Sequence, residues 1–293
     1  MWKSVFNQVY RTATKVRKHD SQLALHLRHI SSECEGLSVE NKDCVLWVKF
    51  DRPTKFNAIT REMYIGMTSA FNEANNDKTV RAIVLTGSGE YYSSGNDLTN
   101  FIKAMQDEGG PKVGLTKSKE ILHNFVDSMI NLDKLLIAAV NGPAVGIPVT
   151  TLPLCDYVIA SDKATFQTPF TALGQCPEAC SSYTIPKMLG TSRATELLLL
   201  NMSWTAQKAK NYGLVSDVIE HSSFYSHLDK LLKGIVHSTY PVSITESKKL
   251  IKDTVTKETL RRVNKHECEV ILERWLSDEC NDAVKKFFNR TKK

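Results

Sequence analysis

The sequence predicts an α/β fold that ends in a helical region. Short runs rich in Val, Ile and Leu alternate with segments whose apolar side chains recur every three or four positions, which is the alternation of strands with amphipathic helices. From about residue 178 onward the helical pattern dominates. With 293 residues, of which 42% are hydrophobic and 24% charged, the chain is long enough to bury a substantial core.

The predicted strands are short and stop at turn residues. Cys44–Phe50 alternates and ends before Asp51-Arg52-Pro53, whereas Arg81–Thr86 and Lys134–Val140 are apolar runs followed by glycine-containing turns. Continuous apolar runs are typical of buried strands, so we expect the last two to be buried. Two further short strands are predicted at Cys155–Ala160 and Ala164–Gln167.

Helices are predicted between these strands. Thr60 can cap a helix whose apolar face contains Met63, Met67, Ala70 and Phe71, three and four residues apart. The same spacing recurs over Ser118–Ile130. Residues 104–114 are rich in glycine and are expected to form a loop.

Residues 1–40 are expected to be a basic leader. Of the net charge of +6, residues 1–30 carry +5, with six basic residues against one acidic residue. Such a segment is typical of a transit peptide, and a solvated helix or arm is the alternative. We expect a mitochondrial matrix location, with the peroxisome as alternative; the C-terminus, Asn289–Lys293, is not of the Ser-Lys-Leu type. The remaining chain is nearly neutral, so no nucleic-acid partner is expected.

Metal sites and membrane spans are not expected. The seven cysteines form no CxxC pair, and the eight histidines form no HExxH pattern. The densest apolar run, Leu197–Leu200, is far shorter than the roughly 20 residues that cross a bilayer, so no stable membrane insertion is expected.

Two glycine-containing loops follow buried strands and are each expected to open a helix. They are Tyr91–Leu98 (YYSSGNDL) and Asn141–Pro148 (NGPAVGIP). Turns of this kind can leave backbone N–H groups free to bind an anion or a polarised carbonyl, or they can be tight turns only. An oxyanion hole needs two donors that converge from separate segments, and two such loops could supply them.

A third segment, Gly174–Tyr183 (GQCPEACSSY), adds the carboxylate of Glu178. Because Glu178 follows a proline, it is expected in the first turn of a helix. It is either a catalytic acid or base, or a side chain that complements the positive end of that helix.

The ordered motifs RPTKFNAI, YYSSGNDL, AAVNGPAVGI, CDYVIASDKATFQTPF and LGQCPEACSSY resemble the crotonase (enoyl-CoA hydratase/isomerase) superfamily over roughly residues 40–290. SSGNDLTNF, NGPAVGI, GQCPEACSSY and RWLSDEC are most similar to its peroxisomal-type Δ3,Δ2-enoyl-CoA isomerases, without their acyl-CoA-binding domain. The resemblance implies a crotonase (ClpP-like) β-β-α spiral core over residues 41–225. It also implies a helical region over 226–293 that mediates trimerisation and covers CoA, and a homotrimer.

The resemblance also implies a set of site residues. Glu178 would be the single catalytic acid and base, and the backbone N–H groups of Asn96 and Ile147 would form the oxyanion hole. The residues implied to bind the acyl-CoA substrate are Lys55, Asn57, Ala58, Ser94, Gly95, Asn96, Asp97, Leu98, Gly146 and Ile147.

The implied reaction moves the double bond of a 3-enoyl-CoA to C2–C3, a step in the β-oxidation of unsaturated fatty acids. It needs no cofactor beyond the coenzyme A of the substrate. The two carboxylates that a hydratase needs fall at the positions of Thr150 and Phe170, so hydration is expected to be weak or absent. The alternatives are a non-catalytic module that binds CoA or a protein, and another crotonase reaction. Trp275 is expected to pack within a C-terminal helix.

Overall fold

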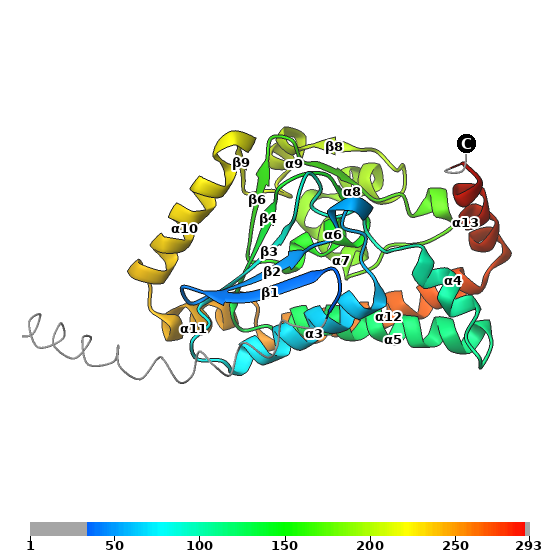
Figure 1. The fold of residues 1–293 in the computed structure, drawn as a ribbon, viewed down its shortest axis with the longest axis horizontal. Coiled ribbons are helices and arrows are strands. Elements are labelled where there is room, and N and C mark those ends of the chain that lie inside the picture. Colours follow the sequence, from blue (N-terminus) through cyan, green and yellow to red (C-terminus); the bar gives the residue numbers. More distant parts are fainter. Residues whose placement is uncertain (1–33, 291–293) are drawn as a thin grey trace, which may run out of the picture. The chain divides into compact units, whose positions relative to one another are not determined.

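The computed structural model describes residues 34–290, and its main sheet has six strands in the order β1-β2-β3-β4-β6-β9 (Figure 1). β1 pairs with β2 in antiparallel fashion and all other neighbours are parallel. The strands are β1 (Leu37–Lys42), β2 (Val45–Phe50), β3 (Ala82–Gly87), β4 (Leu135–Val140), β6 (Tyr157–Ser161) and β9 (Asp217–Ile219).

A second sheet of three strands, in the order β5-β7-β8, accompanies the first. Its strands are β5 (Ala144–Val145), β7 (Thr165–Gln167) and β8 (Trp204–Thr205). β4 and β6 belong to the large sheet, and each is followed along the chain by a strand of the small one. The chain therefore passes repeatedly between two sheets, which confirms the α/β spiral that the resemblance implies.

Three helices run side by side along the lower side of the view in Figure 1 and form one wall of the candidate site. They are α3 (Arg61–Asn76), α5 (Pro111–Asn131) and α12 (Thr254–Leu276). As predicted, α3 begins after Thr60, whose side chain accepts a hydrogen bond from the Met63 N–H at 3.3 Å. Its buried face contains the predicted apolar residues.

The C-terminal region is helical, as predicted. Its helices are α10 (Phe224–Ser238), α11 (Pro241–Ile251), α12 and α13 (Asp278–Arg290). Phe224, Leu228 and Leu232 of α10 are buried in one cluster with Val84 and Ile159 of the large sheet, which holds this region on the core.

Short helices connect these parts. The α-helices are α4 (Thr99–Met105), α6 (Ile147–Thr150), α7 (Ser181–Leu189), α8 (Thr191–Leu198) and α9 (Ala206–Tyr212). The 3₁₀ turns are η3 (Pro53–Lys55), η4 (Leu152–Leu154), η5 (Thr171–Leu173) and η6 (His221–Ser223). Pro148 lies in the first turn of α6, where its missing N–H costs little, and this helix is only four residues long.

The loop prediction for residues 104–114 is wrong at both ends. α4 continues to Met105 and α5 starts at Pro111, so only residues 106–110 connect them. Gly114 lies within α5, and a Cβ there would sit 2.0 Å from the Ala104 carbonyl oxygen. This glycine allows two helices to touch and does not mark a loop.

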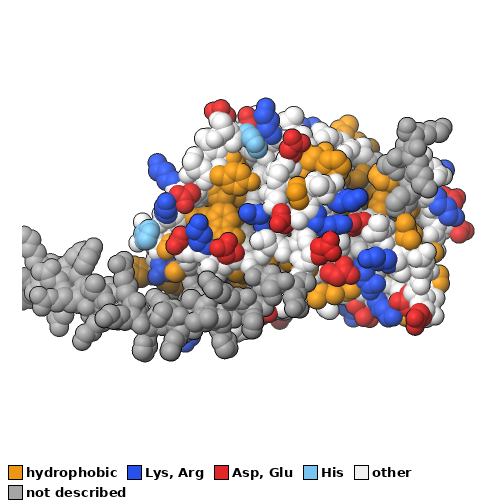
Figure 2. All heavy atoms as spheres, viewed as in Figure 1, with side chains coloured by type: hydrophobic (Ala, Val, Ile, Leu, Met, Phe, Trp, Pro, Cys, Tyr) orange, Lys and Arg blue, Asp and Glu red, His pale blue; other side chains and the backbone are white. Residues whose placement is uncertain are grey.

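Strand β1 extends across residue 40, where the leader was expected to end; residues 1–33 of that leader lie outside the described residues. Among residues 34–290, no helix has both the length and the apolar character needed to cross a bilayer. On the face drawn in Figure 2, acidic and basic side chains are interspersed.

Candidate active site

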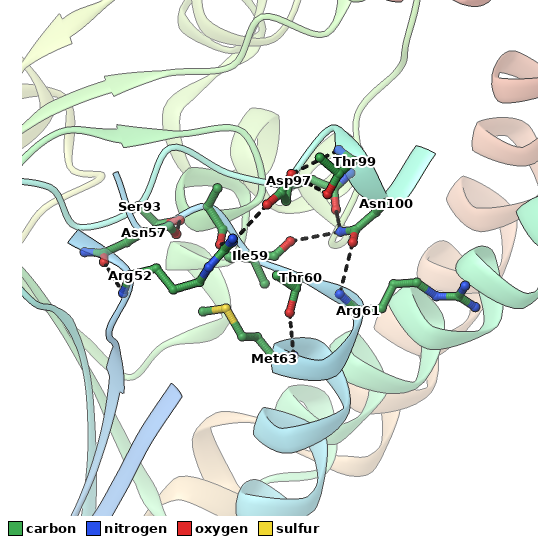
Figure 3. Close-up of polar contacts among 12 residues, drawn as sticks. Arg52, Asn57, Ile59, Thr60, Arg61, Met63, Ser93, Asp97, Thr99 and Asn100 are labelled. Carbon is green, nitrogen blue, oxygen red and sulfur yellow. Dashed lines mark hydrogen bonds and ion pairs between the residues drawn. The ribbon is translucent and has the colours of Figure 1, made fainter. Parts of the chain in front are cut away.

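Two segments far apart in sequence form the first wall of the site, residues 52–60 and residues 93–100 (Figure 3). Ile59 and Asn96 form a parallel bridge, in which the Ile59 N–H donates to the Gly95 oxygen at 2.8 Å and the Asp97 N–H to the Ile59 oxygen at 2.9 Å. An ion pair between Arg52 and Asp97, 2.8 Å long, holds the same segments together. The guanidinium group of Arg52 also donates a hydrogen bond to the carbonyl oxygen of Ala58.

Asn57 fixes the shape of the first segment from inside. Its side chain is 0% exposed and its amide donates to the carbonyl oxygens of Ser88 (2.8 Å) and Tyr91 (2.7 Å). The amide oxygen accepts from the Arg52 N–H at 2.9 Å. Since these bonds occupy the amide, Asn57 acts on the site through the backbone that it holds.

Asn100 orients the side chain of Asn96. Its amide donates to the Asn96 side-chain oxygen at 2.8 Å and to the Ile59 oxygen at 2.9 Å, while its own oxygen accepts from the Arg61 N–H (Figure 3). The start of α3 and the start of α4 are thereby joined through one buried amide.

The second loop, around residues 143–147, packs directly against the first. The Val145 N–H donates to the Ser93 oxygen at 3.0 Å, and the Ser93 N–H donates to the Pro143 oxygen at 3.2 Å. A Cβ on Gly95 would lie only 2.5 Å from the Val145 oxygen, and Gly95 has a φ of +90°. Only glycine permits this approach.

The two loops bring two unpaired donors to the same region. Within residues 34–290, neither the N–H of Asn96 nor that of Ile147 donates a hydrogen bond. Asn96 follows Gly95, and Ile147 begins α6 immediately after Gly146, which has a φ of +70°. Unpaired N–H groups on adjoining loops can bind an oxygen that carries negative charge.

Glu178 lines a pocket that encloses about 630 Å³ including its open mouth. Asn96 and Leu98 line the same pocket, between α3, α4, α5 and α12. The other lining residues are Arg61, Tyr64, Asn100, Phe101, Leu115, Ser118, Ile121, Leu122, Gln175 and Trp275. Seven of these thirteen residues are hydrophobic, and Glu178 is the only carboxylate among them.

The Glu178 carboxylate is poised to accept a proton. Burial, and secondarily the negative charge of Glu267, raise its pKa to about 8. It has no hydrogen-bond partner among the described residues. Tyr64 lies close enough for the Glu178 charge to contribute to raising its pKa, although burial is the main cause.

Glu178 does not lie in the first turn of a helix. α7 starts at Ser181, and its first N–H groups are occupied by Glu267 of α12, whose carboxylate accepts from the N–H groups of Cys180 (2.6 Å) and Ser182 (2.8 Å). The carboxylate that complements the positive N-terminal end of α7 is therefore that of Glu267, and not that of Glu178.

The structure gathers some of the expected site residues and leaves others aside. Ile147 is 1% exposed and does not line the pocket, although its loop touches Gly95. Lys55 lies in η3 and is exposed to solvent. The N–H of Ser94 donates a hydrogen bond to the carbonyl oxygen of Phe56, the residue that follows η3. Trp275, expected only to pack, also lines the pocket.

Sequence reasoning missed Tyr64 and Glu267. Tyr64 lies beside Met63 and Met67 on the buried face of α3, and an aromatic residue on such a face gives no separate signal. Glu267 does give a signal in the sequence, because it is an acidic residue among the buried positions of α12, where acids are rare. In residues 34–290, no group of three His, Cys, Asp or Glu side chains is placed to hold a metal.

Comparisons with known proteins agree with this architecture. A family model described as enoyl-CoA hydratase/isomerase matches residues 40–293. The chain is 46% identical over 263 residues to enoyl-CoA delta isomerase 2 of Rattus norvegicus, covering 90% of this chain and 66% of that protein. It therefore spans slightly less than two thirds of that relative.

The chain is also 42% identical over 261 residues to "Enoyl-CoA delta isomerase 3, peroxisomal" of Mus musculus, covering 89% of this chain and 80% of that protein. Among solved structures, an enoyl-CoA hydratase/isomerase from Pseudoalteromonas atlantica T6c is similar with a TM-score of 0.79 at 32% identity. That match covers 87% of this chain and 98% of the other. The family match, the two-sheet spiral and the adjoining glycine loops agree: the chain belongs to the enoyl-CoA hydratase/isomerase family of the crotonase superfamily.

Proposed function

We propose that this chain is a Δ3,Δ2-enoyl-CoA isomerase that converts 3-enoyl-CoA to trans-2-enoyl-CoA. The observation that carries the proposal is Glu178, a carboxylate without a hydrogen-bond partner among the described residues, in a pocket that it shares with Asn96 and in which it is the only carboxylate. The similarity to proteins named enoyl-CoA delta isomerases supports the same reaction.

Glu178 can serve as both base and acid in this reaction. Its carboxylate takes a proton from C2, and the electron pair left behind is delocalised over C2–C4 and the thioester oxygen. The protonated carboxyl then returns the proton at C4, and the double bond comes to lie between C2 and C3. A positioned carboxyl group contributes about 10²–10⁴-fold to such proton transfers, most effectively when its pKa is near the working pH.

The N–H groups of Asn96 and Ile147 would bind the thioester oxygen as it becomes negative. Donors placed in this way contribute about 3–4 kcal/mol each to the transition state. Leu98 and Gly146 would adjoin the bound acyl-CoA. The segment Lys55–Ala58, in which Lys55 is exposed, would line the channel for the CoA portion together with Ser94 to Asp97.

The reaction is redox-neutral and needs only proton transfer and oxyanion binding, so we propose that the chain works without a metal or redox cofactor. The rate should then be unchanged after dialysis against a chelator.

Isomerisation of a 3-enoyl-CoA by wild type and by Glu178→Gln tests the proposal. The substitution keeps the shape of the side chain and removes the base, so we expect kcat to fall by about 10²–10⁴-fold. Glu108→Gln, at an exposed position between α4 and α5, is the matched control and should behave as wild type. Full activity of Glu178→Gln would remove the proposed base, and acyl-CoA binding without turnover in wild type would favour a non-catalytic module.

Hydration of crotonyl-CoA distinguishes the isomerase from a hydratase. Thr150 is 0% exposed with its hydroxyl donating to the Ile147 oxygen, and Phe170 is 3% exposed, so neither offers a second carboxylate. We expect hydration to be at least about 10²-fold slower than isomerisation, because one of the two acid–base groups is missing. Comparable rates would contradict the isomerase assignment.

We also propose a mitochondrial matrix location and a homotrimeric assembly. Imaging of the intact chain and of a version that starts at Cys34 tests the location while leaving strand β1 complete. Mitochondrial signal that depends on residues 1–33 is expected, and peroxisomal signal from both would contradict it.

A further inference from the structure

Glu267 is a buried acid on a helix remote in sequence from the catalytic loop. It is 5% exposed, and its two carboxylate oxygens accept separate hydrogen bonds from the N–H groups of Cys180 and Ser182. These two residues flank the start of α7, directly after Glu178. An acid placed between two backbone donors in this way fixes the local chain direction.

α12 holds the Glu178 loop at both ends. Arg274, two helical turns after Glu267, donates from Nε to the Gly174 oxygen at 3.1 Å. At the other end, the Cys180 thiol donates to the Leu260 oxygen at 3.3 Å. Residues 174–180, which carry Glu178, are therefore bracketed by contacts to a single helix.

The backbone between Glu178 and α7 needs such support. Ala179 and Cys180 have φ values of +57° and +63°, in the left-handed region that non-glycine residues rarely adopt. The Glu267 hydrogen bond to Cys180 lies at this turn. Without it, the turn would relax toward ordinary φ values and Glu178 would move.

We propose that Glu267 is a positioning residue that holds the turn after Glu178 and adds a second negative charge next to it. The proposal rests on the proposed role of Glu178 as the base. Glu267 itself touches no substrate atom in this assignment and acts through Glu178.

The electrostatic surroundings agree with this role. Burial is the main cause of the raised pKa of Glu178, and Glu267 is the second. Burial also raises the pKa of Glu267, while its hydrogen bonds from Ser182 and Cys180 oppose the rise. Within the described chain, neither carboxylate has an ion pair with Lys or Arg. Other titratable or charged groups near the pair include Arg61 and Tyr64 on α3, Lys119 and Asp127 on α5, Cys176 and Cys180 near the loop, His266, Cys268 and Arg274 on α12, and Cys280 on α13.

Glu267→Gln removes the charge and leaves one oxygen to accept one of the two N–H bonds. We expect kcat to fall by on the order of tenfold with little change in KM, because Glu178 is displaced while the pocket remains. We also expect the acidic limb of the pH profile to move down by about one pH unit, since a like charge next to the base is gone. Glu267→Asp keeps the charge on a shorter side chain, so kcat should fall while the acidic limb moves less than in Glu267→Gln.

Glu269→Gln is the matched control, because it makes the same change at an exposed position on the same helix. It should leave kcat and the pH profile as in wild type. A Glu267→Gln profile identical to that of Glu269→Gln overturns the proposal. If Glu267→Gln does not fold, Glu267→Asp carries the test, and a wild-type kcat there overturns it.

An infrared titration of the Glu178 carboxyl, identified by difference against Glu178→Gln, gives the same answer without turnover. A downward shift in Glu267→Gln supports the electrostatic role even if wild type proves inactive, in which case only the isomerase assignment fails. Activity in wild type with no shift in the variant overturns the role of Glu267 alone.

Discussion

At the scale of single residues, the protonation of Glu178 links the structure to rate. Its pKa is about 8, raised mainly by burial, and the base must be ionised to take a proton. Below this pH most molecules hold Glu178 in the neutral form. We therefore expect kcat/KM for isomerisation to rise with pH and to level off above about pH 8. A profile that is flat across this range would show that Glu178 is not the group that limits the rate.

Glu178 should also lower the stability of the fold at neutral and alkaline pH. Its pKa is about 8 when folded and 4.5 ordinarily, so between these values the folded state binds the proton more tightly. Stability from this group is therefore lost as pH rises from about 4.5 to about 8. Glu178→Gln should be more stable than wild type by on the order of 4 kcal/mol near pH 8, and nearly equal near pH 4.

Urea unfolding of both proteins at the two pH values measures this difference, with Glu108→Gln as the exposed control. A variant that loses activity and gains stability would show that Glu178 serves function at a cost in the stability of the fold. Lower stability of Glu178→Gln near pH 8 would instead indicate a structural role.

At the scale of elements, the approach of the two glycine loops depends on Gly95. Gly95→Ala would place a Cβ 2.5 Å from the Val145 oxygen and forces the loops of Asn96 and Ile147 apart. We expect a loss of about 1–3 kcal/mol in the free energy of unfolding and roughly 10²-fold in kcat/KM. Gly213→Ala is the control, because its φ of +92° is equally unfavourable but its nearest contact is 3.9 Å away. Equal losses of activity in both variants would contradict the assignment of these loops.

The elements that the sequence predicts well are those with a complete local signal. The apolar runs of β3 and β4 are bounded by turns, and α3 has both a cap and a periodic face, so each is predicted to within a few residues. β8 and β9 are two and three residues long and have no measurable period. They exist through pairing with β7 and β6, which no local pattern reports.

The candidate site was predictable only in part for the same reason. The loops and Glu178 could be found as motifs, but their local chemistry left structural roles open. Contacts such as Arg52 with Asp97 or Glu267 with Cys180 join residues 45 and 87 positions apart. Such contacts form only in the folded chain. They determine which polar side chains are used in internal hydrogen bonds and which remain available to a substrate.

At the scale of the whole molecule, α11 and its flanks leave large apolar side chains in solvent. Tyr240, Val242, Leu250, Ile251 and Val255 are 69–83% exposed. Tyr240 and Ile251 line one pocket, and exposed apolar surfaces of this kind are typical of interaction sites. We use this surface to test the proposed homotrimer, since burying such side chains against other copies contributes about 1.5–3 kcal/mol each.

Light scattering of the wild-type protein should give three times the chain mass of 32.9 kDa. Ile251→Asp places a charge on the α11 surface and should shift the mass toward that of one chain, because burying an unpaired carboxylate is strongly unfavourable. Ile65→Asp, at a side chain 55% exposed on α3, makes the same change elsewhere and should leave the mass unchanged. A single-chain mass for wild type would reject the trimer, and an unchanged mass for Ile251→Asp would place the interface on another surface.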